Sequence, residues 1–295
     1  MILTSDEYHE EYIISALKAG KNVMTEKPLT LSVPSARRII QAEKEAKGPR
    51  VFVGYMRRYA ASFTEAFTRE VDSIPKILYA RSRDIIGPNS FFVAQSGTFQ
   101  AKNTDLPSTT ADERQSRLDA LYAEAFPGQS ITSTHENYCR FLGGLGSHDL
   151  SLMREALGFP ESVAGVSVNY PFYSAIFNYR NKTGEPFAVS YETGNDGVPD
   201  FDAHLTVYGE GKRVMIKYDT PYIKGLPIKV VVQEANEYGE VQQREIISSY
   251  EDAYTIELKE MYECFVNGKT IKTSAEDALN DLRLFDMMYA SWNKQ

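Results

Sequence analysis

Cysteine is scarce in this chain, since Cys139 and Cys264 are the only two among 295 residues and lie far apart. A small disulfide-stabilised domain needs a dense, even set of cysteines, so that class is excluded and reduced, structural thiols are expected. Histidine is also rare, with four residues. Cys, His and carboxylate residues nowhere have the spacing of metal ligands, so the sequence predicts no metal.

Positive charge is in deficit, with 32 Lys and Arg against 40 Asp and Glu and a net charge of -8. A nucleic-acid partner would need a basic footprint, and the scattered basic residues do not form one. Long apolar runs are missing too, because the most apolar segment, YPFYSAIFNY (170–179), is short and contains Ser and Asn. The first residues lack the pattern of a secretory signal. We expect a cytoplasmic protein that binds neither nucleic acid nor membrane.

Strands and helices alternate in the first third of the chain. Ser32 is placed as the N-cap of the second helix, Pro34 lies in its first turn, and Gly20 and Gly48 stand where the two helices should end. Strands separated by helices of this length pair in parallel. The expected strands are 2–4, 22–25 and 51–55, and the expected helices are 8–20 and 33–48.

The pattern changes after about residue 75 to alternating polar and apolar positions, which predicts an antiparallel sheet with one exposed face. A mostly helical insertion is expected between residues 86 and 160, and two helices, 254–268 and 274–292, close the chain. The expected strands of this second part are 76–85, 162–170, 175–179, 187–193, 203–209, 213–218 and 228–235.

The triplet Glu26-Lys27-Pro28 follows the second expected strand. A lysine at the carboxyl end of a parallel strand lies where open α/β sheets bind ligands, and Pro28 fixes the backbone directly after it. Burial would lower the pKa of this lysine and the neighbouring carboxylate would raise it, and the sequence leaves the balance open. Taken alone, the triplet is typical of a surface ion pair at a strand end.

Its surroundings are more specific. The stretch from His9 to Leu29, H-x6-A-L-x-A-G-K-N-V-x-x-E-K-P-L, resembles the Gfo/Idh/MocA family of NAD(P)-dependent oxidoreductases. Three further segments are similar to that family in the same order: VGYMRRY (53–59), GSHDLSLMREALG (146–158) and TSAEDALNDLRLFDMMYAS (273–291). The resemblance implies an α/β plus α+β fold. A partial Rossmann-like parallel sheet, residues 1–75, would precede a substrate and oligomerisation domain, residues 76–295, with an open, mainly antiparallel β-sheet and helices.

The resemblance also implies a function, the oxidation or reduction of a sugar, polyol or related hydroxy compound with NAD or NADP. Lys27 would orient the reacting oxygen and His148 would move its proton, as hydride removal from a carbinol requires. A homo-oligomer, or pairing with a full-length relative, is implied as well. The other implied site residues are Thr4, Ser5, His9 and Glu26 for the cofactor and Tyr55, Arg57, Arg58 and Asp149 for the substrate.

The chain departs from the family in two places. It has no G-x-G-x-x-G turn, the motif that holds a dinucleotide pyrophosphate on a helix N-terminus, so we expect a truncated nucleotide domain in which NAD(P) binding is in doubt. GGLG (143–146) and GEGK (209–212) are interpreted as turns rather than replacements. Gly144 stands where many family members have an Asp, four residues before His148. Asp149 either compensates for this loss or caps a helix.

Two alternatives to the oxidoreductase follow from the missing motif. The Lys27 and His148 pair could serve a redox-neutral isomerase, lyase or cyclase, because acid/base chemistry needs no hydride carrier. A non-catalytic subunit is the other alternative.

By default, Arg57 and Arg58 would lie on a solvated face after a strand. Four further residues are expected to be structural: His135 and His204, which lack a motif, and Tyr170 and Tyr173, which are assigned to core packing.

Overall fold

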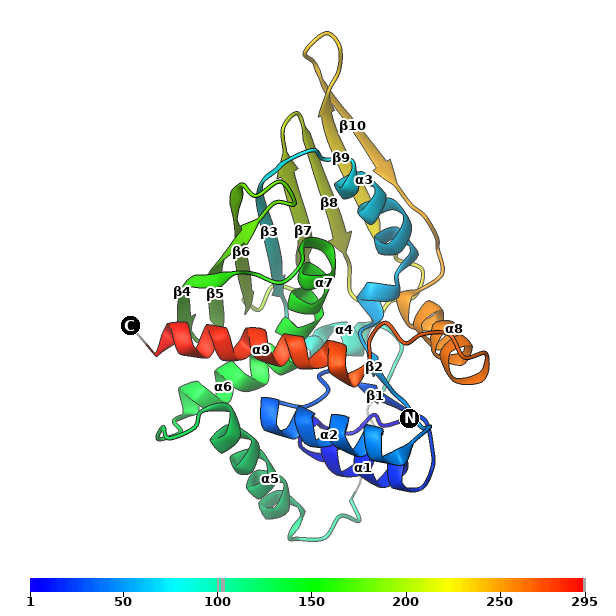
Figure 1. The fold of residues 1–295 in the computed structure, drawn as a ribbon, viewed down its shortest axis with the longest axis vertical. Helices are drawn as coiled ribbons and strands as arrows, with labels where there is room; N and C mark the ends of the chain where they lie inside the picture. The colour runs from blue at the N-terminus through cyan, green and yellow to red at the C-terminus, as the bar shows by residue number, and fades with distance from the viewer. Residues whose placement is uncertain (100, 102–103, 294–295) are drawn as a thin grey trace. The chain divides into compact units, whose positions relative to one another are not determined.

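The structure of the chain is a computed structural model that describes residues 1–99, 101 and 104–293 (Figure 1). The chain divides into two compact units. Unit 1 comprises Met1–Tyr55, Gln100–Ser147 and Leu258–Tyr289, and unit 2 comprises Met56–Phe99, His148–Glu257 and Ala290–Gln295. Each unit therefore combines three separate segments of the chain. The domain boundary expected at residue 75 was drawn where the sequence pattern changes, and it stays a prediction.

A small parallel sheet forms the centre of unit 1. Its strands β1 (Val23–Glu26) and β2 (Val51–Gly54) pair with Val23 opposite Val51. Both strands are buried along almost their whole length, as is usual where helices cover a parallel sheet. At residues 2–4, where a strand was expected, Ile2 forms a single parallel bridge to Thr25. The predicted parallel pairing is confirmed.

The helix α2 (Val33–Ala46) begins as its sequence predicts. The Ser32 hydroxyl accepts a hydrogen bond from the Ser35 backbone N–H at 3.2 Å, which satisfies one of the donors left open at a helix N-terminus. The end of this helix differs from the prediction. The left-handed residue is Lys47, with φ 52°, and Gly48 has no positive φ, so the left-handed position comes one residue earlier than expected.

Apolar faces of further helices complete the core of unit 1. Ile13 and Leu17 of the first helix are almost fully buried, and Gly20 follows that helix with φ 72°. The rings of Phe126 and Tyr289 lie 4.5 Å apart between their centroids. The helices that contribute to unit 1 besides α2 are α1 (His9–Lys18), α5 (Thr110–Ala125), α6 (Ser133–Phe141), most of α9 (Ala275–Trp292) and the C-terminal part of α8 (Ala253–Val266).

Unit 2 is built on an eight-stranded sheet with the order β10-β9-β8-β7-β3-β6-β5-β4 (Figure 1). Within the described part of this sheet, β3 and β6 pair in parallel, and the other neighbouring strands are antiparallel. The mainly antiparallel sheet of the prediction is confirmed. The strands are β3 (Ile77–Ile86), β4 (Ser162–Asn169), β5 (Phe172–Arg180), β6 (Pro186–Asn195), β7 (Phe201–Gly209), β8 (Lys212–Tyr218), β9 (Lys229–Ala235) and β10 (Val241–Ile246).

One face of this sheet is buried and the other is partly exposed. Alternate residues such as Ala80, Tyr191 and Val207 are fully buried, which is the period-two pattern that predicted the strands. Tyr173 is buried as expected, whereas Tyr170 is 69% exposed, so its assignment to the core was wrong. Tyr170 follows the last residue of β4 in a turn, where the chain has left the sheet. The edge strand β10 was missed because almost all of its side chains are exposed.

Helices lie against the buried face of the sheet. The π-helical segment η3 (Ser62–Phe67) packs on β8 and β9, and the Ser62 hydroxyl donates to the Ile228 carbonyl at 2.6 Å. The other helices with residues in unit 2 are α3 (Thr68–Asp72), α4 (Asn89–Gln95) and α7 (Ser147–Leu157), together with the N-terminal part of α8. None of the helices in the described part of the chain is long and apolar enough to cross a bilayer.

Candidate functional site

Lys27 directly follows β1 in unit 1, at the carboxyl end of the parallel sheet. Its ammonium donates a hydrogen bond to the Gly144 carbonyl at 2.5 Å, and its backbone N–H donates to the Glu26 carboxylate at 3.2 Å. The peptide bond between Lys27 and Pro28 is cis. The half-buried lysine is therefore aimed at a defined backbone group 117 residues away in sequence.

The His9 ring connects two backbone segments, one of which directly follows this lysine. The ring is fully buried, with Nδ1 2.8 Å from the Pro28 carbonyl and Nε2 3.1 Å from the Thr4 carbonyl. Because both nitrogens face backbone oxygens, His9 fixes the loop after Ile2 against the turn after Lys27. Of the other residues expected to bind the cofactor, Thr4 and Ser5 are exposed and Glu26 is half-buried. Their cofactor role, like that of His9, stays a prediction.

Two carboxyl groups lie in the electrostatic range of Lys27. Burial raises the pKa of Glu26, and the Lys27 charge partly offsets that rise. Burial also raises the pKa of Asp6, which lies in the 3₁₀ helix η1 (Asp6–Tyr8), and the charges of His9 and Lys27 oppose the rise. Sequence reasoning missed Asp6, because its nearness to Lys27 depends on the parallel bridge between Ile2 and Thr25.

GGLG is helical rather than a turn, which corrects the interpretation from sequence. Leu142–Gly146 forms the π-helical segment η4, and Gly143 has no positive φ. The glycine is needed for space: a Cβ on Gly143 would lie 2.5 Å from Leu31 Cδ2 and 3.3 Å from Pro28 Cγ. GEGK, in contrast, is the predicted turn, between β7 and β8.

Gly143→Ala should therefore lower the free energy of unfolding by about 1–3 kcal/mol, because overpacking forces neighbouring side chains to shift. Chemical denaturation measures this loss. Gly144→Ala is the matched control, since a Cβ there meets no atom within 4 Å and should leave the stability nearly unchanged. Equal effects of the two substitutions would contradict the packing argument.

Unit 2 contains a buried ionic cluster around Arg57. One guanidinium nitrogen lies 3.0 Å from Asp84 on β3 and 2.5 Å from Asp149 on α7, and all three side chains are at most 5% exposed. The Tyr218 ring lies against the guanidinium, 4.6 Å from its centroid. Arg57 was assigned by default to a solvated face; its burial overturns that expectation. The reason is that it pairs with two carboxyl groups inside the unit.

Asp84 and Asp149 together carry one charge more than Arg57 can neutralise. Among the described residues, Asp84 Oδ1 and Asp149 Oδ2 have no hydrogen-bond donor. Burial, the Asp84 charge and a hydrogen bond to Asp84 raise the pKa of Asp149 well above its usual range. A proton on Asp149 that is donated to Asp84 satisfies both oxygens and leaves the cluster neutral. Asp149 is thus a buried partner of Arg57 rather than a helix cap.

The Asp149 carboxyl should make stability depend on pH. Because its folded-state pKa is raised, its contribution is fully present below the ordinary Asp pKa of about 3.9 and is lost as the pH rises through the folded-state value. In Asp149→Asn the side chain is always neutral, so this loss of stability should not occur. Between the ordinary Asp pKa and the raised pKa, the free energy of unfolding of the variant should increase relative to that of the unchanged chain by up to about 1.4 kcal/mol per pH unit. Urea denaturation at a series of pH values measures the slope. Asp200→Asn, at an exposed position, serves as the control, and equal slopes in all three chains would refute the shared proton.

The remaining predicted residues lie in one unit or the other. Arg58 is 3% exposed and pairs with Glu155 of α7 at 2.5 Å, so it too is not on a solvated face. His148 is half-buried in the first turn of α7, next to Asp149 in sequence. Tyr55 is buried at the end of β2 in unit 1. The structure therefore joins Glu26, His9 and Lys27 in unit 1 and joins Arg57 with Asp149 in unit 2.

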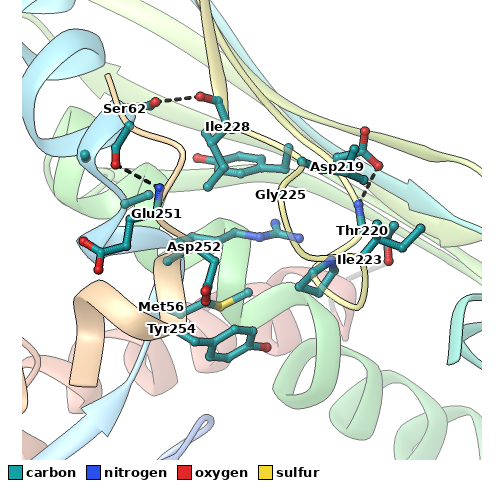
Figure 2. Close-up of a pocket in the computed structure, with 18 residues that line it drawn as sticks. Met56, Ser62, Asp219, Thr220, Ile223, Gly225, Ile228, Glu251, Asp252 and Tyr254 are labelled. Carbon is teal, nitrogen blue, oxygen red and sulfur yellow. Dashed lines mark hydrogen bonds between the residues drawn. The ribbon is translucent and has the colours of Figure 1, made fainter. Parts of the chain in front are cut away.

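A cavity of about 60 Å³ opens beside Arg57 within unit 2 (Figure 2). Met56 and Tyr254 line one part of it, and the loop after β8 lines another. Both polar and apolar groups line it, and its volume is smaller than the roughly 300–1,000 Å³ of pockets that enclose a whole drug-sized ligand. Its labelled polar residues are Ser62, Asp219, Thr220, Glu251, Asp252 and Tyr254. Sequence reasoning missed this cavity, because its walls come from segments with no common motif.

This chain has groups that suit the nicotinamide end of NAD(P) but lacks the turn that holds its pyrophosphate. Exposed hydroxyls of Thr4 and Ser5, the Glu26 carboxyl and the Lys27 ammonium fit the polar nicotinamide end of NAD(P). The glycine-rich turn that a pyrophosphate requires does not occur in this sequence. In the part of the chain that the structure describes, His, Cys, Asp and Glu nowhere form a group of three that could hold a metal ion.

Part of the chain is similar in sequence to curated dehydrogenases. Two curated relatives are inositol 2-dehydrogenases, one from Paracoccus denitrificans (36% identical over 86 residues) and one from Agrobacterium fabrum (40% over 87). Each alignment covers 28% of this chain, and it spans only 26% of the Paracoccus protein and 25% of the Agrobacterium protein.

Solved structures share the fold over nearly the whole chain. An aldose-aldose oxidoreductase from Caulobacter crescentus matches with a TM-score of 0.67 at 16% identity, covering 100% of this chain and 78% of that protein. A 3-ketoreductase from Actinomadura kijaniata matches with a TM-score of 0.66 at 15% identity, covering 97% and 76%.

The family models account for most of the sequence. Residues 1–55 match the NAD-binding Rossmann fold of an oxidoreductase family, and residues 132–295 match the C-terminal alpha/beta domain of the same family. Together with the parallel sheet of unit 1 and the mixed sheet of unit 2, these matches decide the assignment. The chain belongs to the Gfo/Idh/MocA family of oxidoreductases.

Proposed function

We propose that this chain takes part in the NAD(P)-dependent interconversion of a hydroxyl and a carbonyl group on a polyol or sugar. The observation that carries the proposal is the Lys27 ammonium, which is held against the Gly144 carbonyl at the carboxyl end of β1. Ligands of open α/β sheets bind at this end of the strands. The inositol dehydrogenases among the relatives support a cyclic polyol as the first substrate to test.

Lys27 and His148 have separate tasks in this proposal. The Lys27 ammonium donates a hydrogen bond to the reacting oxygen, which stabilises negative charge as the hydroxyl proton leaves. His148 accepts that proton in oxidation and returns it in reduction. The chemistry that bound NAD(P) would supply is the acceptance or donation of the hydride. Thr4, Ser5, His9 and Glu26 are proposed for the nicotinamide side, and Tyr55, Arg57, Arg58 and Asp149 for the substrate side.

For the buried residues of the substrate side, a supporting role fits their contacts. Arg57 and Asp149 are hydrogen-bonded to each other inside unit 2, so their part is to hold the start of α7, where His148 lies. The cavity beside Arg57 offers carboxyl and hydroxyl groups, and such groups accept hydrogen bonds from a polyol. We propose it as a place for hydroxyls remote from the reacting carbon.

The test is nicotinamide reduction by the purified chain with inositol and a panel of aldoses, with NAD and NADP in parallel. Substrate-dependent reduction that His148→Gln abolishes supports the proposal, and the control is His135→Gln, which changes a half-buried histidine in a helix capping box. A redox-neutral change of the substrate without nicotinamide would support an isomerase, lyase or cyclase instead. No conversion under any condition would favour a non-catalytic subunit.

Assembly belongs to the proposal as well. The partly exposed face of the eight-stranded sheet presents charged pairs such as Arg83 with Glu192 and Asp202, which suit contact with a second copy or with a longer relative. Sedimentation of the chain alone and of the chain mixed with such a relative separates a homo-oligomer from a mixed one.

A further inference from the structure

The segment that connects β8 to β9, residues 219–228, forms part of the wall of the cavity beside Arg57 (Figure 2). Ile223 and Leu226 of this segment line the cavity, although they are 41% and 42% exposed. Side chains that line a cavity and also contact solvent lie at its mouth. Residues 219–228, the β8–β9 loop, therefore lie between the cavity and the solvent.

The sequence of the β8–β9 loop limits its own backbone hydrogen bonds. Pro221 and Pro227 have no backbone N–H to donate, and Gly225 has a positive φ of 86°. The loop is attached at its ends, to β8 on one side and, on the other, through the Ile228 carbonyl, which accepts a hydrogen bond from the Ser62 hydroxyl at 2.6 Å. The middle of the loop can thus move while its ends stay in place.

Lys224, in the middle of this loop, contacts another wall of the cavity. Its ammonium lies 3.1 Å from Asp252 Oδ1 and 5.2 Å from the centroid of the Tyr254 ring. Asp252 and Tyr254 both line the cavity, at the start of α8. An ion pair and a cation–π contact therefore connect the loop to the helix.

The Asp252 carboxylate is held in place independently of Lys224. It accepts hydrogen bonds from the Thr255 backbone N–H at 3.1 Å and from the Thr255 hydroxyl at 2.8 Å, so it caps α8. Burial would raise the pKa of Asp252, but the hydrogen bonds from Thr255 and Lys224 lower it below its usual range. The lysine thus meets a charged partner that is already fixed by the helix.

The contact of Lys224 with α8 is weak enough to open. The Lys224 side chain is 64% exposed and that of Asp252 is 31% exposed. At such sites an ion pair and a cation–π contact together favour the closed position by about five- to tenfold. A loop held by a preference of this size opens and closes without unfolding of the rest of the domain.

We infer that the β8–β9 loop is a lid over the cavity beside Arg57, which Lys224 holds closed against Asp252 and Tyr254. Opening of the lid admits the hydroxyl-bearing end of a ligand, and closure removes it from bulk water. The identity of this ligand rests on the proposed function, whereas the lid itself rests on the contacts of the loop.

A cysteine in the cavity wall reports lid opening without any reaction of a substrate. The native Cys139 and Cys264 are buried in unit 1. Ala60→Cys places a thiol at a position that lines the cavity and is 3% exposed, and its alkylation by iodoacetamide is followed by peptide mass spectrometry. In this chain Lys224→Met should speed the alkylation about five- to tenfold, because the closed position is less favoured.

Lys229→Met is the matched control. Lys229 pairs with Glu245 at 3.0 Å and is also partly exposed, but this pair joins β9 to β10, so its loss should leave the alkylation rate unchanged. If the Ala60→Cys chain does not fold, Ala61→Cys, at a half-buried position that also lines the cavity, replaces it. Equal rates in Lys224→Met and Lys229→Met overturn the inference.

Asp252→Asn separates the charge from the helix cap. Asparagine caps a helix about as well as aspartate, so α8 should keep its start while the ion pair is lost and alkylation becomes faster. The double variant with Lys224→Met should be no faster than Lys224→Met alone, because both changes remove the same contact. Added salt should speed alkylation in the chain that keeps Lys224 and not in Lys224→Met. Rates that multiply in the double variant contradict a shared contact.

Inositol separates the lid from the proposed function. A polyol bound in the cavity should slow the alkylation, and in a chain that oxidises inositol Lys224→Met should raise KM by about five- to tenfold. Alkylation that responds to Lys224→Met, with neither protection by inositol nor its oxidation, supports the lid and contradicts the proposed function. Oxidation of inositol by a chain whose alkylation does not respond to Lys224→Met contradicts the lid and leaves the function standing.

Discussion

Arg57→Met should lower the free energy of unfolding by about 3–5 kcal/mol, because removing one member of a buried ionic cluster leaves an uncompensated charge inside the protein. Methionine keeps much of the volume of arginine, so the loss reports charge rather than a cavity. In the variant, Asp84 and Asp149 would remain buried without a cation, and the contact with Tyr218 would be lost as well. Denaturant unfolding followed by circular dichroism measures the change.

The chain offers a closely matched control. Arg83 also pairs with two carboxylates, Glu192 and Asp202, but its side chain is 28% exposed, against 5% for Arg57. Arg83→Met should cost about 1 kcal/mol or less, since solvent can hydrate the carboxylates that remain. Equal losses in the two variants would show that burial does not set the energy of the Arg57 cluster.

A triple variant distinguishes charge from packing. Arg57→Met combined with Asp84→Leu and Asp149→Leu removes all three charged groups together, and an apolar replacement of a whole buried cluster is often neutral or stabilising. Most of the stability lost in Arg57→Met should therefore return. Failure of the triple variant to recover stability would mean that the hydrogen-bond geometry between η2 (Met56–Tyr59), β3 and α7, and not neutralisation, holds this part of unit 2.

Lys27→Met should reduce kcat/KM for polyol oxidation by about 10²- to 10³-fold, the effect expected when one oriented donor to a developing oxyanion is removed. The stem of the side chain is kept, so the change removes the ammonium and its bond to the Gly144 carbonyl. Steady-state kinetics with the best substrate and nicotinamide measures it. The loss should fall mainly on kcat, because the interaction strengthens in the transition state.

Lys27→Arg and Lys21→Met complete this experiment. The guanidinium keeps the charge but cannot occupy the same point, so Lys27→Arg should recover only part of the activity. Lys21→Met changes an exposed lysine of the same segment and should leave kcat/KM unchanged. Full activity in Lys27→Met would exclude the lysine from the reaction and with it the mechanism proposed for this family member.

Local chemistry in the sequence predicted the fold where neighbours in sequence decide it. The Ser32 cap, the turn at Gly20 and the alternation along the strands of the large sheet are examples, and the family motif added the position of Lys27. Arg57 could not be placed in this way. Its burial depends on Asp84 and Asp149, which lie 27 and 92 residues away and carry no pattern that links them to it.

Two further differences have the same origin. The glycines of GGLG favoured a turn, yet Gly143 is helical because a close approach to Leu31 and Pro28 needs a residue without a Cβ. The electrostatic influence of Lys27 on the Asp6 carboxyl depends on a bridge between Ile2 and Thr25 that sequence periodicity does not encode. Long-range partners, and not local propensity, thus determined the parts of the site that the sequence did not predict.

The parallel pairing of β3 with β6 affects how the protein is made. Tyr79 of β3 pairs with Ala188 of β6, 109 residues later, and with Tyr208 of β7 on its other side. During translation β3 therefore leaves the ribosome long before either neighbour exists. A strand with both edges open is a target for wrong association, and contacts this distant in sequence also slow folding. The central strand of unit 2 should therefore need protection from wrong association while the chain is being made.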